Sequence, residues 1–270
     1  MTQRRIVLTG ATGGIGQAIA RCLASEGHRL VLLGRRREAL ESLRASLERP
    51  EQHGIYQVDL SDASAVSAMC TELSTFCGSG GIDVLINNAG AAQFALLEDS
   101  SDPEAMMAVN LLAPIRVTQG LLPTLLRSER ACVINIGSTF GSIGYPGFSL
   151  YCASKFGLRG FTEALQRELA DQAIAVHYLA PRAVATEMNS AAVVNLNRDL
   201  GNAVDSPEVV AAAVRGLISE RRGTRRYLGW PESLFVRLNQ IVPSVVAKAL
   251  RKQLPAIRRY ASVASVESKP

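Results

Sequence analysis

The stretch Thr9-Gly-Ala-Thr-Gly-Gly-Ile-Gly16 decides the fold that we predict for this chain. It follows the apolar segment Arg5–Leu8 and opens a helical pattern over Gly14–Glu26, so its glycines lie in a turn from a strand into a helix. Glycines in such a turn let the backbone approach a pyrophosphate, which the free N–H groups of the helix start can bind. The stretch therefore predicts a dinucleotide site at the end of a first strand.

Outward from this turn, apolar runs alternate with helical patterns, which is typical of a parallel sheet covered by helices. The fold class predicted is α/β, a Rossmann-type doubly wound parallel sheet of about seven strands with helices on both faces. The expected strands are Arg5–Leu8, Arg29–Leu33, Ile55–Val58, Val84–Ile86, Ala131–Ile136, Ile174–Leu179 and Arg226–Leu228. The expected helices are Gly14–Glu26, Arg37–Glu48, Ala63–Phe76, a long helix after Pro103 that must accommodate Pro114, Ser149–Ala170 and Pro207–Glu220. A loop is expected from Pro181 to about Asp205, and a disordered tail from about Ser262.

The length of 270 residues suits one large domain. We divide it into a catalytic and cofactor-binding part, 1–228, and a basic helical extension, 229–270, packed on or beside the same domain. The extension carries the excess charge: Arg221 to Arg259 holds ten Lys or Arg and one acid, Glu232, so this segment has +9 and the rest of the chain −4.

Cysteine and histidine usage sets the expected compartment. Five cysteines, an odd number without a C-x-x-C pair, favour reduced thiols and a cytoplasmic location. Three histidines without a tight Cys/His/Asp cluster indicate no metal site. Arg4 and Arg5 run directly into a short apolar strand, and no run of about 18 apolar residues follows, so neither a signal peptide nor a membrane-spanning helix is expected.

The second expected strand ends in Leu33-Gly-Arg-Arg-Arg37. An acid at this point of a dinucleotide fold binds the adenosine ribose, whereas a guanidinium would bind a 2′-phosphate. We therefore predict NADP(H) over NAD(H), with Arg35 as the main contact and Arg36 in support, against the alternative of a solvated basic helix start. Asp59, at the end of the third strand, is placed to meet the adenine amino group.

Tyr151 and Lys155 stand four apart in a predicted helix and therefore share one face. A phenol beside a fixed ammonium can ionise below its usual pKa of about 10. It can then exchange a proton with an alcohol or ketone near neutral pH. The pair, read with the glycine turn, predicts hydride transfer.

These residues bring out a resemblance to the short-chain dehydrogenase/reductase family. The matching elements are Thr9-Gly-x-x-x-Gly-x-Gly16, Asn87-Asn-Ala-Gly90, Asn110, Ser138 and Tyr151-x-x-x-Lys155. They occur in the order and spacing of the family and cover roughly residues 4 to 230. Tyr-x-x-x-Lys alone is common by chance, whereas all five elements in register are highly specific.

The resemblance implies a role for each catalytic residue. Tyr151 would be the acid in reduction or the base in oxidation, and Lys155 would lower the phenol pKa and bind the nicotinamide ribose. Ser138 would hold the substrate oxygen, and Asn110 a water that links Lys155 to solvent. Asn87 would also support the centre of the sheet. The cofactor contacts predicted are Gly10, Thr12, Gly14, Ile15, Gly16, Arg35, Arg36, Asp59, Leu60, Asn87, Ala89, Gly90, Tyr151, Lys155, Pro181 and Thr186.

The chain departs from the family pattern after the sixth strand. The run Pro181-Arg-Ala-Val-Ala-Thr186 keeps the proline and the threonine, which could bind the nicotinamide carboxamide, but has Arg182 where the family has glycine. Arg182 either points to solvent or indicates an anionic group on the substrate.

The second departure is the C-terminal extension. Ile241, Val245, Val246, Ala249 and Leu250 form a helical apolar stripe with basic residues among and after them. Three alternatives stay open: packing on the domain or in a homodimer, contact with an anionic membrane surface, and a site for an acidic carrier. No aromatic interleaving supports nucleic acid.

The segments around Phe140–Phe148 and Thr186–Asp205 are expected to line the substrate pocket. Their apolar residues favour a hydrophobic ketone or aldehyde over a sugar, with a 3-oxoacyl thioester as one analogy. These residues are Ile143, Tyr145, Phe148, Met188, Ala191, Ala192, Val193 and Val194. The expected activity is an NADP(H)-dependent carbonyl reductase or alcohol dehydrogenase; the alternatives are a sensor or scaffold that binds NADP(H) with little turnover, and a lipid reductase recruited to a membrane surface. The resemblance suggests a homodimer or homotetramer formed through the long helices.

Overall fold

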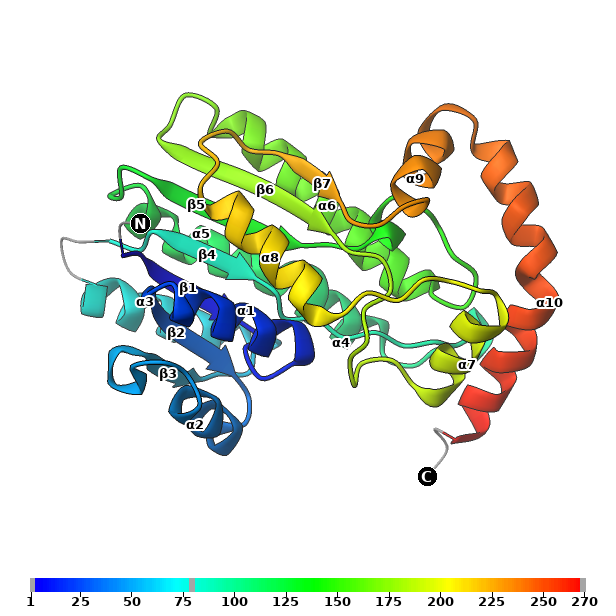
Figure 1. The fold of residues 1–270 in the computed structure, drawn as a ribbon, viewed down its shortest axis with the longest axis horizontal. Coiled ribbons are helices and arrows are strands. Elements are labelled where there is room, and N and C mark those ends of the chain that lie inside the picture. Colours follow the sequence, from blue (N-terminus) through cyan, green and yellow to red (C-terminus); the bar gives the residue numbers. More distant parts are fainter. Residues whose placement is uncertain (1–2, 78–80, 268–270) are drawn as a thin grey trace.

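A computed structural model describes residues 3–77 and 81–267. Its centre is a parallel sheet of seven strands in the order β3-β2-β1-β4-β5-β6-β7 (Figure 1). The strands are β1 (Arg5–Thr9), β2 (Arg29–Gly34), β3 (Gly54–Gln57), β4 (Val84–Asn87), β5 (Ala131–Ile136), β6 (Ile174–Ala180) and β7 (Arg225–Tyr227). The expected strands are confirmed, with ends that differ by at most one residue.

The α-helices are α1 (Gly14–Ser25), α2 (Arg37–Ala45), α3 (Ala63–Cys77), α4 (Pro103–Met107), α5 (Ala113–Leu125), α6 (Ser149–Glu168), α7 (Ala191–Asp199), α8 (Pro207–Ile218), α9 (Glu232–Ile241) and α10 (Pro243–Glu267). The helices form two layers, one on each face of the sheet, and each layer has its own hydrophobic core. On one face α1 and α8 pack together around Ile19, Leu23 and Val214, and on the other α3, α5 and α6 pack around Met69, Val117 and Leu165. The doubly wound α/β fold is confirmed.

The long helix after Pro103 is not continuous α-helix. Residues Ala108–Leu112 form a π-helical segment between α4 and α5, and Pro114 falls in the first turn of α5. The wider turn accommodates a residue that has no N–H to donate, so the proline needs no sharp kink.

Within the described residues the run Pro103–Leu125 is also the one helix long and apolar enough to cross a bilayer by composition. Its Val117, Leu121 and Leu125 lie in the core on α3, as in a core helix.

Two sequence predictions in the second half are wrong. The expected loop over 181–205 contains α7, capped by the Ser190 hydroxyl, which accepts from the Val193 N–H. The expected disordered tail from Ser262 is helical through Glu267, and residues 268–270 lie outside the described residues. The two segments pack on each other: Ile257 and Ala261 of α10 are buried against Val193 and Leu196 of α7. Tertiary packing thus stabilises two short amphipathic segments whose own helical signal is weak.

Candidate active site

The carboxyl ends of β1, β4, β5 and β6 meet at one edge of the sheet, because these four strands are parallel neighbours. The strand order reverses between β1 and β4, and ligands of open α/β sheets bind beside such a reversal. The glycine turn follows β1, Asn87–Gly90 closes β4, Ser138 follows β5, and Pro181 follows β6. The fold therefore gathers the sequence motifs at this edge.

The glycine turn has the shape that a pyrophosphate requires. Gly13 caps α1 with no side-chain hydrogen bond, so the first N–H groups of the helix are left for an anion. Gly10 has φ +63°, and a Cβ there would lie 2.7 Å from the Cα of Ala89. A Cβ on Gly16 would lie 2.2 Å from the Gly10 carbonyl oxygen. The turn is thus packed closely between α1 and the end of β4, and a side chain at Gly10 or Gly16 would clash with the backbone there.

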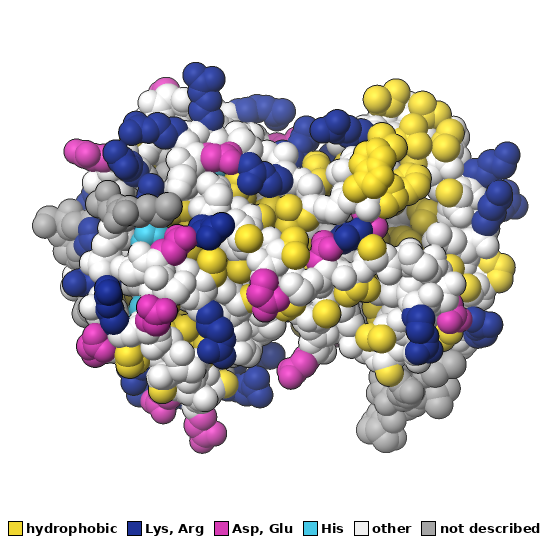
Figure 2. All heavy atoms as spheres, viewed as in Figure 1, with side chains coloured by type: hydrophobic (Ala, Val, Ile, Leu, Met, Phe, Trp, Pro, Cys, Tyr) yellow, Lys and Arg dark blue, Asp and Glu magenta, His cyan; other side chains and the backbone are white. Residues whose placement is uncertain are grey.

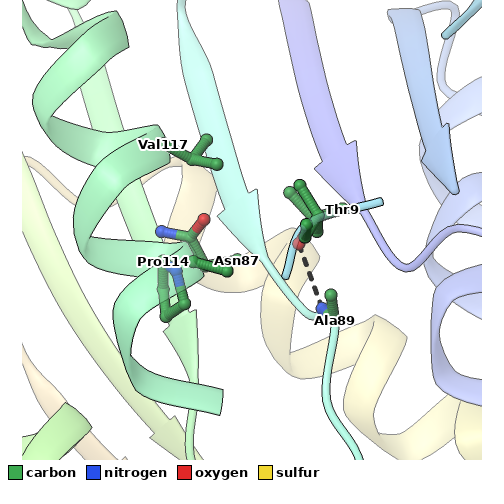
Figure 3. A pocket seen from close by; sticks show the side chains of 7 residues that line it. Thr9, Asn87, Ala89, Pro114 and Val117 are labelled. Carbon is green, nitrogen blue, oxygen red and sulfur yellow. Dashed lines mark hydrogen bonds between the residues drawn. The ribbon is translucent and has the colours of Figure 1, made fainter. Parts of the chain in front are cut away.

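Asn88, which the sequence reasoning left without a role, fastens this turn. Its side-chain amide donates to the carbonyl oxygens of Thr9, at 3.1 Å, and Gly10, at 3.0 Å. The Thr9 hydroxyl accepts from the backbone N–H of Asn88 and from that of Ala89, the second of which Figure 3 shows. Asn88 lies inside a motif that the sequence reasoning quoted, so the signal was present, but the direction of its amide depends on the pairing of β1 with β4.

Asn87 faces the interior of the sheet. Its amide donates to the hydroxyl of Thr118 at 3.0 Å and to the side-chain oxygen of Asn135 at 2.8 Å. This is the supporting role that the resemblance implied. Asn87 also borders a tight hollow at the switch point (Figure 3), lined by Thr9, Leu60, Asn87, Ala89, Ala113, Pro114 and Val117.

The adenosine side presents free cations. Arg35 and Arg36 are exposed directly after β2, and neither has an ion pair among the described residues, whereas Arg37 pairs with Glu41. Beside them after β3, Asp59 accepts from the hydroxyl and the backbone N–H of Ser61. These hydrogen bonds, with a smaller contribution from Arg35, lower the Asp59 pKa. The edge thus offers unpaired guanidinium groups next to a fixed carboxylate. Thr12 lies nearby, within reach of the Gly34 end of β2.

Ser138, Tyr151 and Lys155 come together at the end of β5. The Ser138 side chain lies close enough to the Tyr151 phenol to act on its pKa. The Lys155 ammonium is buried, donates to the Ile136 carbonyl at 3.0 Å and lies 5.7 Å from the centre of the Tyr151 ring. One helix face therefore presents an acid and a cation to the same strand end, as the four-residue spacing predicts.

The protonation of this group differs from the sequence expectation. Burial raises the pKa of Tyr151 to about 12, and the hydrogen bond from Ser138 offsets only part of that rise. Burial also lowers the pKa of Lys155 to about 8. The expectation of a lowered phenol pKa is therefore wrong, because desolvation disfavours the charged form of both groups. Tyr151 keeps its proton near neutral pH, which is the state of a proton donor.

Asn110 lies in the π-helical segment and is fully buried. Its side chain accepts from the Ala91 N–H and donates to the Ala91 carbonyl, both at 2.8 Å, and also donates to the Ser154 hydroxyl. Gly90 separates it from Lys155: a Cβ on Gly90 would lie 3.3 Å from the Asn110 oxygen and 3.6 Å from the Lys155 nitrogen. Asn110 thus lies beside the Lys155 ammonium, across Gly90, and its water-holding role stays a prediction.

Tyr178 is a further site residue that sequence reasoning missed. Its buried hydroxyl donates to the Ser138 carbonyl at 3.2 Å and accepts from the Ser138 N–H at 3.3 Å. A Cβ on Gly137 would lie 2.1 Å from the Tyr178 ring. Tyr178 therefore fixes the backbone that carries the Ser138 hydroxyl. Nothing in the sequence of β6 distinguishes it from an ordinary core aromatic.

Aromatic rings surround Tyr151 on the substrate side. Phe140 stacks on Tyr145 with centroids 4.7 Å apart, and Phe148 lies 6.1 Å from Tyr151. Helices α7 and α10 close over these rings, and we call the whole group the aromatic cluster: Phe94, Leu96, Phe140, Tyr145, Phe148, Tyr151, Cys152, Ala192, Val193, Leu196, Leu200, Ala256, Ile257, Tyr260 and Ala261.

Four residues of the expected pocket lining lie elsewhere. Ile143 packs with Val236 of α9 and Val246 of α10. Ala191 is exposed, and Met188 and Val194 face solvent with 48% and 54% of their surface exposed. In helix α7, Val193 faces the core and Val194 faces solvent. The sequence predicted a loop here, so it could not distinguish the two residues.

The sequence left two alternatives for Arg182: that it points to solvent, or that it indicates an anionic group on the substrate. The structure shows neither. Its guanidinium donates to Asp205 at 2.7 Å and to Glu232 at 3.1 Å, and it also reaches the Trp230 carbonyl. The side chain is 16% exposed, so it is not solvated, and the chain itself supplies its anions. Gly229, with φ +89°, makes room for it, since a Cβ there would lie 2.6 Å from the Arg182 Cδ. Arg182 joins the loop after β6 to the start of α9.

The same loop returns to the cofactor edge. The Thr139 N–H donates to the Pro181 carbonyl at 3.1 Å. The Thr186 methyl group lies against the glycine turn, since a Cβ on Gly14 would lie 2.8 Å from it. Both residues therefore border the place where the cofactor is predicted.

A doubly wound sheet with a glycine turn at its switch point and a serine, a tyrosine and a lysine gathered at the same edge defines a nicotinamide-dependent oxidoreductase of alcohols and carbonyl compounds. The short chain dehydrogenase family model matches residues 4–196. The chain belongs to that family.

Relatives extend the match over most of the chain. Dehydrogenase/reductase SDR family member 7B of Xenopus tropicalis is 31% identical over 255 residues, which are 89% of this chain and 82% of that protein. A short-chain dehydrogenase from Streptomyces avermitilis superposes with a TM-score of 0.77 at 28% identity, covering 92% of this chain and 94% of the other. The closed form of a serine dehydrogenase complexed with NADP+ superposes with a TM-score of 0.72 at 29% identity, covering 82% and 94%.

Proposed function

We propose that this protein is an NADP(H)-dependent carbonyl reductase or alcohol dehydrogenase for a hydrophobic ketone or aldehyde. The observation that carries the proposal is the gathering of Ser138, Tyr151 and Lys155 at the end of β5, at the base of the aromatic cluster. A phenol and a second hydroxyl at one strand end could meet the same carbonyl oxygen.

The roles of the chain's own groups follow from their contacts. In reduction, Tyr151 donates its proton to the substrate oxygen, and Ser138 holds that oxygen. Lys155, buried beside the Tyr151 ring, provides positive charge that stabilises the phenolate left behind. A bound nicotinamide cofactor supplies or accepts the hydride. The rings of Phe140, Tyr145 and Phe148 favour an apolar substrate.

The residues at the cofactor edge fit NADP(H). The uncapped start of α1 suits the pyrophosphate, and the unpaired Arg35 and Arg36 suit a 2′-phosphate. The NADP+ complex of a structural relative adds support.

The catalytic proposal is tested with Tyr151→Phe. Turnover of NADPH with a panel of apolar ketones should fall at least about a hundredfold, because the proton donor is lost. Binding of NADPH, followed by its fluorescence, should persist. The matched control is Tyr56→Phe on β3, away from the site, which should turn over normally. Normal turnover by Tyr151→Phe would refute the acid role, and NADPH binding by the wild type without oxidation of any substrate would favour a sensor.

The cofactor proposal is tested with Arg35→Asp. Affinity for NADPH should fall at least about tenfold, and the preference should shift to NADH, because a carboxylate repels a 2′-phosphate. Arg37→Asp is the control, since Arg37 already pairs with Glu41. Equal NADPH dissociation constants for wild type and Arg35→Asp would show that Arg35 does not read the phosphate.

We further propose a homodimer or homotetramer in the cytoplasm. Exposed Leu112, Leu126 and Phe156 on or beside the long helices α5 and α6 support assembly there. The unpaired thiols of Cys22, Cys70, Cys132 and Cys152 suit a reducing compartment. Light scattering on the purified chain measures the assembly.

A further inference from the structure

The C-terminal extension carries a cluster of exposed apolar side chains. Of the 14 large apolar residues that stand exposed in the described chain, six fall within 16 residues of α9, the loop before it and the turn into α10. Ile241 is 79% exposed and Trp230 is 70% exposed. We call this group the apolar tip: Trp230, Leu234, Phe235, Ile241, Val242 and Val245. Figure 2 shows an apolar patch where α9 and the start of α10 lie.

The apolar tip is separate from the packing that holds these helices in place. Val236 of α9 and Val246 of α10 are buried against Ile143, and Asn239 donates to the Ser142 carbonyl at 2.9 Å. The helices thus already bury one face on the domain, and the tip projects from the other. Such a patch on a surface indicates a binding function.

Basic residues follow the apolar tip, and acids are absent. From Ser233 to Val266 the sequence has six Lys or Arg and no Asp or Glu. Arg237, Lys248, Arg251 and Lys252 are exposed and have no ion pair among the described residues. The acid that precedes them in the sequence, Glu232, is turned inward to Arg182.

The order of these residues along α10 matters. Val245, Lys248 and Lys252 stand at i, i+3 and i+7 and therefore share one helix face. The apolar side chain lies at the start of that face, and the cations follow within about 10 Å at 1.5 Å per residue. One face of α10 thus carries an apolar side chain beside the tip and cations farther along, a combination that suits an anionic bilayer surface.

We propose that the apolar tip docks on an anionic lipid bilayer. Its apolar side chains enter the headgroup region, with Trp230 at the interface, and Lys248, Arg251 and Lys252 bind lipid phosphates. A second copy of the chain fits the tip less well, because a two-fold contact would bring the unpaired cations of both copies together. The proposal does not involve Ser138, Tyr151 or Lys155, so it holds or fails apart from the catalytic one.

Trp230 is the single tryptophan of the chain, so the tryptophan fluorescence of the protein reports the environment of the apolar tip. The full chain is mixed with phosphatidylcholine vesicles that contain phosphatidylglycerol, and with pure phosphatidylcholine vesicles. On the anionic vesicles we expect flotation with the lipid, a blue shift of the Trp230 emission, and quenching by brominated acyl chains. Binding should be at least about tenfold weaker on the neutral vesicles and at high salt, where the charge attraction is lost.

Two variants separate the apolar and the charged contributions. Phe235→Ser with Ile241→Ser should abolish the blue shift and the flotation, and Lys248→Glu with Lys252→Glu should remove the preference for anionic lipid. The matched controls are Leu97→Ser and Arg221→Glu with Arg222→Glu, exposed residues outside the tip that should bind as the wild type does. NADPH oxidation with a soluble ketone verifies that each variant is folded.

Three results would overturn the proposal. One is unchanged Trp230 emission with no flotation on anionic vesicles. Another is equal binding by the Phe235→Ser, Ile241→Ser protein and the wild type. The third is self-association, seen by light scattering and lost in that double variant, without lipid binding, which would assign the tip to a second copy of the chain.

Discussion

At the scale of single residues, burial determines which protons the site holds. Lys155 is buried and Tyr151 half-buried, and desolvation raises the pKa of Tyr151 to about 12 and lowers that of Lys155 to about 8. Tyr178 fixes the Ser138 backbone, and the Ser138 hydroxyl oxygen accepts from the Phe140 N–H at 3.1 Å, which leaves its O–H to donate. The phenol of Tyr151 therefore keeps its proton near neutral pH.

His177 is a buried residue whose titration should affect stability. It lies in β6, its Nδ1 accepts from the Thr224 N–H, and its Nε2 is buried without a hydrogen-bond partner. Burial lowers its pKa to about 4. The unfolded chain takes up this proton near pH 6.5, whereas the folded protein does so only near 4. The stability that neutral His177 provides is thus present above about pH 6.5 and lost as the pH falls toward 4.

We expect this linkage to cost about 2 kcal/mol of the free energy of unfolding between pH 7 and pH 5. Urea unfolding at both pH values measures it. His177→Gln, which cannot titrate, should lose less stability than the wild type over the same interval. An equal loss in both proteins would assign the acid sensitivity to other groups.

At the scale of elements, Arg182 links three segments. Asp205 lies beside Val184 in an isolated bridge, and Glu232 opens α9, so one guanidinium fixes the loop after β6 to the segment before α8 and to the extension. A glycine at this position would leave two partly buried carboxylates without their common partner.

Arg182→Met should lower the free energy of unfolding by about 2 kcal/mol and speed proteolysis between residues 229 and 242, because α9 loses its anchor. Urea titration and limited proteolysis measure the two effects. Arg222→Met, an exposed change without an ion pair among the described residues, is the control. In a double-mutant cycle, Arg182→Met and Asp205→Asn should be less than additive; additive losses would mean that the pair is not coupled.

At the scale of the whole molecule, the extension completes the wall of the site. Ile257 and Ala261 of α10 are fully buried against α7 and the aromatic cluster (Figure 1). The cofactor edge, formed by β1, β2 and β4, lies apart from this contact. Substrate binding and cofactor binding should therefore depend differently on α10.

Removal of residues 243–270 should raise the KM for an apolar ketone at least about tenfold, with the NADPH dissociation constant changed less, because the loss exposes Phe94 and Phe148. Steady-state kinetics and NADPH fluorescence measure both. Ile257→Ala is a milder variant, expected to cost about 2–4 kcal/mol of stability and to change KM in the same direction. A truncated enzyme with unchanged KM would mark α10 as dispensable for the site.

The sequence by itself determined the order of strands and helices and the motifs at the strand ends. Local patterns suffice for these features: glycines that free the backbone, alternating apolar runs, and two residues four apart on a helix. Gly10, Ser138, Tyr151 and Lys155 could be located for that reason, and the family resemblance fixed their register.

Only the tertiary structure decided what depends on neighbours distant in the chain. The partners of Arg182 lie 23 and 50 residues away, Tyr178 reaches Ser138 across the sheet, and α7 is stabilised by α10. Burial, too, is a property of the assembled molecule, which is why the sequence predicted a lowered Tyr151 pKa and the folded protein raises it. Sequence spacing sets which side chains share an element, and packing sets the partners and the solvent that those side chains meet.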